Sequence, residues 1–285
     1  MYSDSEMISK QHVQRSFGRA CETYDAAAIV QNEILQRLFE RLDSFGLSPA
    51  RVLDLGCGTG SSRDSFVQRY ADAELVGVDI AFSMTRFAQE LGFNSICADA
   101  ERLPFRDSCF DLVFSASTFQ WCEAVDRLFL NCNQVLGENG FILFSTFGPD
   151  TLHELKHCFA QVDEDVHVNS FLDMHHVGDA LARAGFDRSV VETERITVEY
   201  QNPTQLLKDL KATGANSHSS ESARGLYGKK QFSAMLANYE QFKTDTGTYP
   251  ATYEVIYGHG WKGRAVGGSM DGVVPLHDLR AVKPR

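Results

Sequence analysis

The nine residues from Val52 to Gly60, VLDLGCGTG, place three glycines in five positions directly after an apolar run. The apolar run predicts a short buried strand, and a helical pattern resumes after the last glycine, with Ser61 or Ser62 as its N-cap. A glycine turn between a strand and a helix suits a ligand that lies against bare backbone near the helix N-terminus. A tight turn without a ligand also uses glycine, so the surrounding sequence has to decide between the two interpretations.

The chain beyond this turn alternates between strand and helix patterns. Five short apolar segments with mostly helical connections predict a parallel sheet of the α/β class, covered by helices on both faces. These segments are 51–56, 73–80, 94–100, 109–117 and 140–147. The first 45 residues predict helices with an interruption at Gly18. Two further strands are expected at 189–200 and 248–261, with two helices between them.

Composition excludes several classes of protein. The chain has 285 residues and a net charge of −11, which argues against general affinity for nucleic acid or for an anionic membrane. No apolar run approaches the roughly 20 residues that span a bilayer, and residues 1–20 lack the apolar centre of a signal peptide. Seven cysteines without CxxC spacing favour a reducing cytoplasm. His153 and His157 have metal-compatible spacing but no adjacent third ligand, so we expect no metal site.

An acidic residue ends the second predicted strand, as in nucleoside-binding α/β domains. Asp79 lies 25 positions after Asp54, and its carboxylate is placed to accept hydrogen bonds from both ribose hydroxyls. A dinucleotide fingerprint would require a glycine where Ser61 stands. Asp54 also disfavours a diphosphate, because the two negative charges would repel, whereas it can help to hold a cationic amino-acid group. S-adenosylmethionine carries such an ammonium group, together with a sulfonium, and has no phosphate.

Four stretches resemble successive motifs of class I S-adenosylmethionine-dependent methyltransferases: VLDLGCGTG (52–60), VGVDIAFSM (76–84), ADAERLPFRDSCFDLVFS (98–115) and GFILFST (140–146). The resemblance implies a Rossmann-like, mostly parallel sheet of seven strands, with N-terminal helices and a helical cap inserted before the last strand. The implied organisation is N-terminal helices closing the site (1–48), the S-adenosylmethionine-binding core (49–200), the cap (201–245), the last core strand (246–261) and a flexible tail (262–285).

The same resemblance assigns roles within the cofactor site. The three glycines would pass under the methionine part, Asp79 would bind the ribose, and hydrophobic side chains would pack on the adenine, whose edge an aspartate and a backbone amide would read. The residues implied in cofactor binding are Asp54, Gly56, Gly58, Gly60, Asp79, Ile80, Met84, Asp99, Ala100 and Ser115. Many class I members have Asn or Asp soon after the fourth strand, where this chain has Ala116 and Ser117.

Five further stretches are similar to the malonyl-carrier-protein O-methyltransferases of biotin synthesis (the BioC family). They are FGRACETYDAAAIVQ (17–31), FQWCEAVDRLF (119–129), FSTFGPDTLHEL (144–155), LLKDLKATGAN (206–216) and YPATYEVIYG (249–258). This resemblance implies methyl transfer from S-adenosylmethionine to the free carboxylate of a malonyl thioester. A carboxylate is already ionised at pH 7, so the reaction needs no strong general base. The alternatives are another small carboxylate or a quinone-like acceptor, a hydride-transferring dehydrogenase, and a methyltransferase-like subunit without turnover.

The resemblance also places residues around the acceptor. Tyr24 and Gln31 would close the methionine end of the cofactor site, and Trp121 would line the acceptor cavity. The candidate catalytic residues are Tyr24, Gln120, Trp121 and Lys211, with Lys211 or Arg19 as the cationic partner of the malonyl carboxylate. The expected partner is a malonyl-loaded acyl carrier protein, which is acidic. Basic residues that would attract it are Arg15, Arg19, Lys208, Lys211, Lys229 and Lys230.

Overall fold

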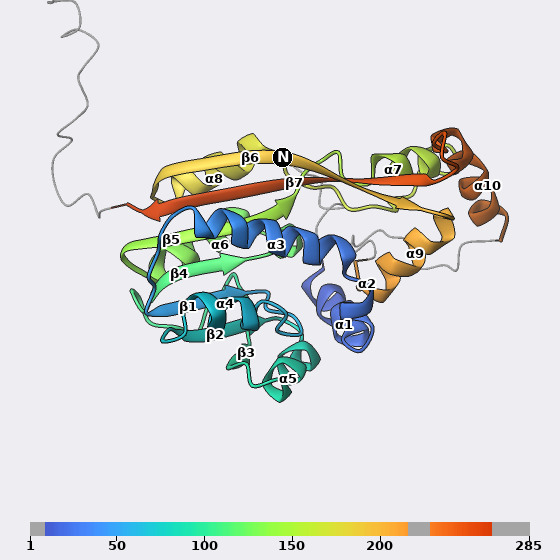
Figure 1. Cartoon of the computed structure of the whole chain (residues 1–285). Coiled ribbons are helices and arrows are strands. Elements are labelled where there is room, and N and C mark those ends of the chain that lie inside the picture. The colour runs from blue at the N-terminus through green and yellow to red at the C-terminus, as the bar shows by residue number, and fades with distance from the viewer. Residues whose placement is uncertain (1–8, 216–228, 264–285) are drawn as a thin grey trace, which may run out of the picture.

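The computed structural model describes residues 9–215 and 229–263, and these residues form one seven-stranded sheet (Figure 1). The strand order is β3-β2-β1-β4-β5-β7-β6, in which β1 to β5 pair in parallel and β7 runs antiparallel to β5 and β6. The strands are β1 (Arg51–Leu55), β2 (Glu74–Asp79), β3 (Ser95–Cys97), β4 (Phe110–Ser115), β5 (Leu136–Phe147), β6 (Phe186–Tyr200) and β7 (Tyr249–Lys262). The predicted fold class is confirmed.

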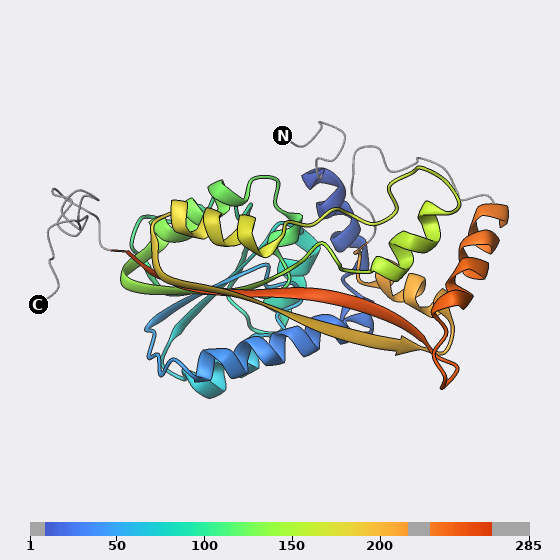
Figure 2. The ribbon, with the colours of Figure 1, turned by 90° about the horizontal axis from the view of Figure 1, so that it is seen from above.

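Helices cover both faces of the sheet. Helix α3 lies on one face, and α6 and α8 lie on the other (Figure 2). The helices are α1 (Lys10–Ala20), α2 (Tyr24–Ala27), α3 (Ile29–Asp43), α4 (Arg63–Arg69), α5 (Phe82–Glu90), α6 (Val125–Val135), α7 (His153–Ala160), α8 (Met174–Arg183), α9 (Pro203–Ala212) and α10 (Lys229–Tyr239), with short 3-10 turns η2 (Phe119–Trp121) and η3 (Glu240–Phe242). Within the described ranges no helix is both long and apolar enough to cross a membrane.

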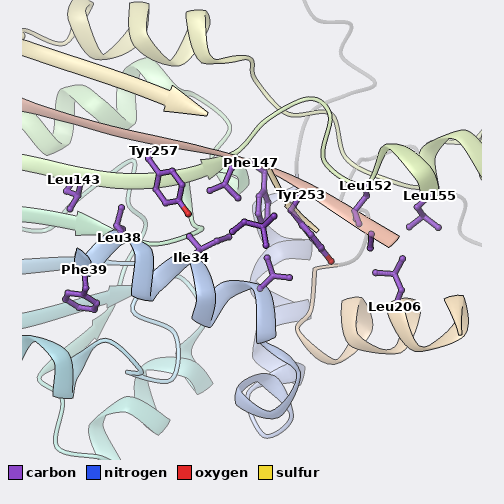
Figure 3. Packing of buried hydrophobic residues seen from close by; sticks show 14 of the residues in the cluster. Ile34, Leu38, Phe39, Leu143, Phe147, Leu152, Leu155, Leu206, Tyr253 and Tyr257 are labelled. Carbon is purple, nitrogen blue, oxygen red and sulfur yellow. The ribbon is translucent and has the colours of Figure 1, made fainter. Parts of the chain in front are cut away.

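The parallel strands are buried on both faces, so their apolar residues alternate between two cores. In β4, Leu112 and Phe114 belong to the core under α3, whereas Val113 belongs to the core under α6 and α8. Figure 3 shows Ile34 and Leu38 of α3 directed at the sheet on the first of these faces. Continuous apolar runs rather than alternating ones are what such doubly covered strands require.

The N-terminal helices differ from the prediction at one point. Helix α1 continues through Gly18, and the chain turns at residues 21–23 instead, before α2 begins at Tyr24. The predicted interruption at Gly18 is therefore wrong. The physical reason is a tertiary contact: a Cβ added at Gly18 would lie 3.1 Å from the Ser83 hydroxyl oxygen, so glycine here permits close approach of α1 to α5.

The helices α9 and α10 are inserted between β6 and β7, as predicted for the cap. Residues 249–254 of β7 pair with β6 alone, so this end of the antiparallel pair extends past β5 (Figure 1). Residues 216–228 of the cap and the predicted tail from residue 264 lie outside the described residues. The last strand extends to Lys262, one residue beyond its expected end.

Candidate active site

The turn after β1 leaves its backbone open on one side. The amides of Gly56 and Cys57 donate to the Val78 carbonyl at 2.7 and 3.0 Å, which fixes the turn against β2. Gly58 has a φ of +52°, and a Cβ added there would meet no heavy atom within 4 Å. Glycine is therefore favoured at residue 58 by its backbone conformation, and the space beside it is free for a ligand.

Two carboxyl groups flank this turn, of which Asp54 is buried and Asp79 is half-buried. Asp79, at the end of β2, accepts hydrogen bonds from the amides of Gly58 at 3.1 Å and Ala81 at 2.8 Å. Asp54 in β1 is 3 % exposed and accepts a hydrogen bond from the Ser62 hydroxyl. Burial raises the pKa of Asp54 to about 7 and that of Asp79 to about 6. Loss of hydration disfavours the charged carboxylate, and a cation bound nearby would restore it.

Two adjoining cavities lie at this edge of the sheet, and they bring together most of the predicted cofactor residues. The first, with about 700 Å³ of empty space, extends between α1, the ends of β2 and β3, and the segment after β4. Predicted cofactor residues that line it are Tyr24, Gly56, Gly58, Asp79, Ile80, Met84, Asp99 and Ala100. Trp121, which was expected to line the acceptor cavity, lies in this cavity as well. The second continues from the glycine turn toward α3, and its predicted residues are Tyr24, Gln31, Asp54, Gly56 and Gly58.

Aromatic side chains from separate segments close the first cavity. Phe17 of α1 lies edge-on to Trp121 with 5.3 Å between ring centroids and 6.3 Å from the Tyr24 ring. Burial, with the charges of Asp79 and Asp25, raises the pKa of Tyr24, so its phenol stays neutral. Since Asp25 accepts a 2.6 Å hydrogen bond from the Thr59 hydroxyl, α2 is tied directly to the glycine turn.

An ion-pair cluster that the sequence did not indicate holds α1 over the same cavity. The Lys10 ammonium contacts the Asp99 carboxylate at 2.7 Å and also pairs with Glu101, whose side chain is 1 % exposed. Glu101 in turn accepts the amide of Ala124 at 2.7 Å, just before α6 begins. Three separate segments therefore meet at one buried carboxylate. No local sequence signal could reveal this cluster, because Lys10 and Asp99 are 89 positions apart.

A third cavity begins beside the first, with about 1380 Å³ of empty space, and Cys122 lines both. Gln120 lines the third cavity, while its side-chain amide donates at 2.7 Å to the carbonyl of Ser117, which lines the first. The Thr146 hydroxyl donates to the Gln120 side-chain oxygen at 3.4 Å. Ser117 has a φ of +54°, a conformation that L-residues rarely adopt, and the Ser145 hydroxyl accepts its amide at 2.9 Å. The polar groups of β5 and η2 thus fix the turn after β4.

Comparison with known proteins identifies the family. A family model described as a methyltransferase domain matches residues 53–144. A malonyl-acyl-carrier-protein O-methyltransferase from Methylovorus sp. is 43 % identical over 287 residues, covering 97 % of each chain. The corresponding protein of Gallionella capsiferriformans is 40 % identical and covers 90 % of this chain and 92 % of its own. The chain belongs to the malonyl-acyl-carrier-protein O-methyltransferase family.

Solved structures add support for the fold alone. The YcgJ protein of Bacillus subtilis superimposes with a TM-score of 0.58 at 15 % identity, covering 81 % of this chain and all of its own. A putative methyltransferase of Bacillus halodurans gives a TM-score of 0.57 at 15 % identity, covering 79 % of this chain and 98 % of its own. These two solved structures therefore share the fold of this chain.

Four residues expected at the site line none of these three cavities: Gly60, Ser115, Lys211 and Arg19, the last of which is exposed on α1. Gly60 has a φ of +93°, and the atoms that a Cβ would meet are the Phe93 ring at 3.1 Å and Ala88. The absence of a side chain at Gly60 therefore makes room for buried residues of the protein and not for a ligand. The Ser115 hydroxyl is fully buried and donates to the Leu55 carbonyl at 2.8 Å. Lys211 is exposed in the last turn of α9.

Proposed function

We propose that this chain transfers a methyl group from S-adenosylmethionine to the free carboxylate of malonyl-acyl-carrier-protein, giving the methyl ester with which biotin synthesis begins. The observation that carries the proposal is the 43 % identity over 97 % of both chains to a protein of that name. The cavities beside the glycine turn support it, because they join an open backbone to two acidic groups. Such a site suits a ligand that carries a ribose and positive charge without phosphate.

The donor is held by residues of the first two cavities. Asp79 at the end of β2 would accept hydrogen bonds from the ribose hydroxyls, and Ile80 and Met84 would offer apolar contacts to the adenine. Asp54 and Gln31 line the second cavity, toward α3, and provide polar partners for the amino-acid end. When bound, S-adenosylmethionine supplies an electrophilic methyl group on a positively charged sulfur.

The acceptor enters, in this proposal, through the third cavity. Gln120 of η2 and Thr146, near the carboxyl end of β5, place neutral hydrogen-bonding groups there, and Cys122 joins this cavity to the first one. A carboxylate oxygen of the malonyl group forms the new bond to the methyl carbon as the sulfur–carbon bond breaks, and the electron pair stays on sulfur. No proton is transferred, so orientation of the carboxylate and exclusion of water supply the rate effect.

The carrier protein would dock on a basic surface formed by Arg15 and Arg19 of α1, Lys208 and Lys211 of α9, and Lys230 of α10. All five are exposed, and within residues 9–215 and 229–263 none of them belongs to an ion pair. Lys229, the sixth residue of the predicted patch, begins α10. A positive surface on an otherwise acidic chain would attract an acidic carrier and set its orientation.

The test is methyl transfer from radiolabelled S-adenosylmethionine to malonyl-acyl-carrier-protein, malonyl-CoA and free malonate. We expect rapid labelling of the carrier-bound substrate, with the label released by mild base as a methyl ester. Equal rates with malonyl-CoA would contradict the docking surface. Failure to label any of the three, with the donor still bound, would refute the proposed acceptor.

The Gln120→Glu substitution tests the acceptor cavity separately. It keeps the shape of the side chain but adds a negative charge next to the proposed position of the malonyl carboxylate. We expect KM for the malonyl substrate to rise about tenfold, which corresponds to about 1.4 kcal/mol, with a smaller change in donor affinity. The matched control is Gln161→Glu on the exposed end of α7. An unchanged KM in Gln120→Glu would place the acceptor elsewhere.

A further inference from the structure

The end of cap helix α9 packs closely against the backbone of α1. Gly214 follows α9 with a φ of +72°, and a Cβ added there would lie 3.0 Å from the Ser16 carbonyl oxygen and 3.1 Å from the Phe17 amide nitrogen. Both neighbours are backbone atoms, so they cannot move aside unless α1 itself moves. Residue 214 therefore sets how closely the cap approaches this helix.

A hydrogen bond beside this contact joins the cap to the same N-terminal segment. The Thr23 hydroxyl donates to the Ala212 carbonyl at 2.9 Å, just before α2 begins. On its other side, α1 is attached to α5, because the Ser83 hydroxyl donates to the Gly18 carbonyl at 2.8 Å. The helix is thus held between the cap and α5, whose Met84 lines the first cavity.

The contacted residue is itself part of the cavity wall. Phe17 lines the donor cavity and lies against Trp121, whereas Gly214 lines none of the described cavities. A change at Gly214 can reach the donor only by moving Phe17 and the helix that carries it. An effect of a Gly214 substitution on donor binding would therefore be due to a change in the position of α1 and not to the loss of a contact between residue 214 and the donor.

We propose that Gly214 is a positioning residue for the methyl donor: its close contact with Ser16 and Phe17 holds α1 closed over the donor cavity. The identification of the ligand as S-adenosylmethionine rests on the proposed function. Because the proposed carrier surface spans α1 and α9, a carrier bound across both elements strengthens the same contact and tightens donor binding. By thermodynamic reciprocity, the bound donor then tightens carrier binding by the same factor.

The test compares Gly214→Ala with Gly247→Ala. Gly247 has a φ of +83°, so alanine there suffers similar backbone strain, but its Cβ would meet no atom within 4 Å. We expect the dissociation constant of S-adenosylhomocysteine, measured by calorimetry, to rise about tenfold in Gly214→Ala, which corresponds to about 1.4 kcal/mol. The control should stay within about twofold of the unsubstituted chain.

The fluorescence emission of Trp121 reports the position of α1, because Phe17 of α1 lies against the Trp121 ring. The chain has two tryptophans, so in a Trp261→Phe background the emission comes from Trp121 alone. We expect Gly214→Ala to shift this emission to longer wavelength as Phe17 moves away from Trp121, and Gly247→Ala to leave it unchanged. The same affinity and emission in both variants would overturn the proposal.

A second variant covers the case in which Gly214→Ala does not fold. Thr23→Val removes the hydroxyl that reaches the cap while keeping a similar shape, and we expect the S-adenosylhomocysteine dissociation constant to rise about threefold. An unchanged constant in this variant would also contradict the proposal. These measurements need no methyl acceptor, so failure of malonyl labelling and failure of this inference remain distinguishable.

Discussion

Lys10 is expected to stabilise the folded chain through the buried carboxylate that it neutralises. Its side chain is 21 % exposed, and the side chain of its partner Glu101 is 1 % exposed. Removal of one member of a fully buried ion pair costs about 3–5 kcal/mol. Partial exposure of Lys10 and the remaining hydrogen bond from the Ala124 amide reduce this figure. We therefore expect Lys10→Met to lower the free energy of unfolding by about 2 kcal/mol, and Tm by about 4 °C.

The assay is thermal and urea denaturation at neutral pH without ligand, because Lys10 also lines the donor cavity. In the double variant Lys10→Met/Glu101→Gln, the buried charge is gone while an oxygen still accepts the Ala124 amide, so at least half of the lost stability should return. Arg86→Met, which breaks an exposed pair with Glu90, should change stability by less than about 0.5 kcal/mol. A double variant no more stable than Lys10→Met would refute the reasoning.

Two further predictions concern the donor site and the sheet. Burial raises the pKa of Asp54 to about 7 and of Asp79 to about 6. Asp54 must lose its proton to face the ammonium group, and Asp79 must lose its proton to accept hydrogen bonds from both ribose hydroxyls. Affinity for S-adenosylhomocysteine should therefore fall as pH decreases from about 8 to about 5.5. Calorimetry in buffers of different ionisation enthalpy would show proton release, and pH-independent binding would contradict this. Gly258→Ala places a Cβ 2.2 Å from the buried Phe144 ring and should cost about 3 kcal/mol in urea denaturation. In Gly137→Ala the nearest atom is 3.5 Å away, and an equal loss there would argue against a steric cause.

The features that the sequence predicts well are those written into short segments. The positions of the strands along the chain follow from the apolar runs, and the position of Asp79 follows from the end of its strand. Both survive in the structure because doubly covered parallel strands leave few other ways to bury such runs. The glycine turn was predicted from its three closely spaced glycines, and the structure agrees at Gly58, which has a positive φ and open space beside it.

The features that the sequence does not predict depend on contacts between distant segments. Gly18 looks like a break in a helix, but the contact with Ser83 makes it a site of close packing. Gly60 has the spacing of a cofactor residue, yet Phe93 and Ala88 occupy the space beside it. The meeting of Lys10 with Glu101 required the loop after β3 and helix α1 to be placed in space first.

The long antiparallel pair of β6 and β7 separates the inserted helices from the parallel part of the sheet. Residues 249–254 pair with β6 alone, and α9 and α10 are carried at that end, beyond the parallel strands. An exchange of these helices leaves the register of this pair and the order of the sheet intact. Because Lys208 and Lys211 of the proposed carrier surface lie on α9 and Lys230 lies on α10, the choice of carrier protein can change with these helices while the donor and acceptor cavities are retained. One condition limits such an exchange: the first inserted helix must still be followed by a residue that, like Gly214, fits against Ser16.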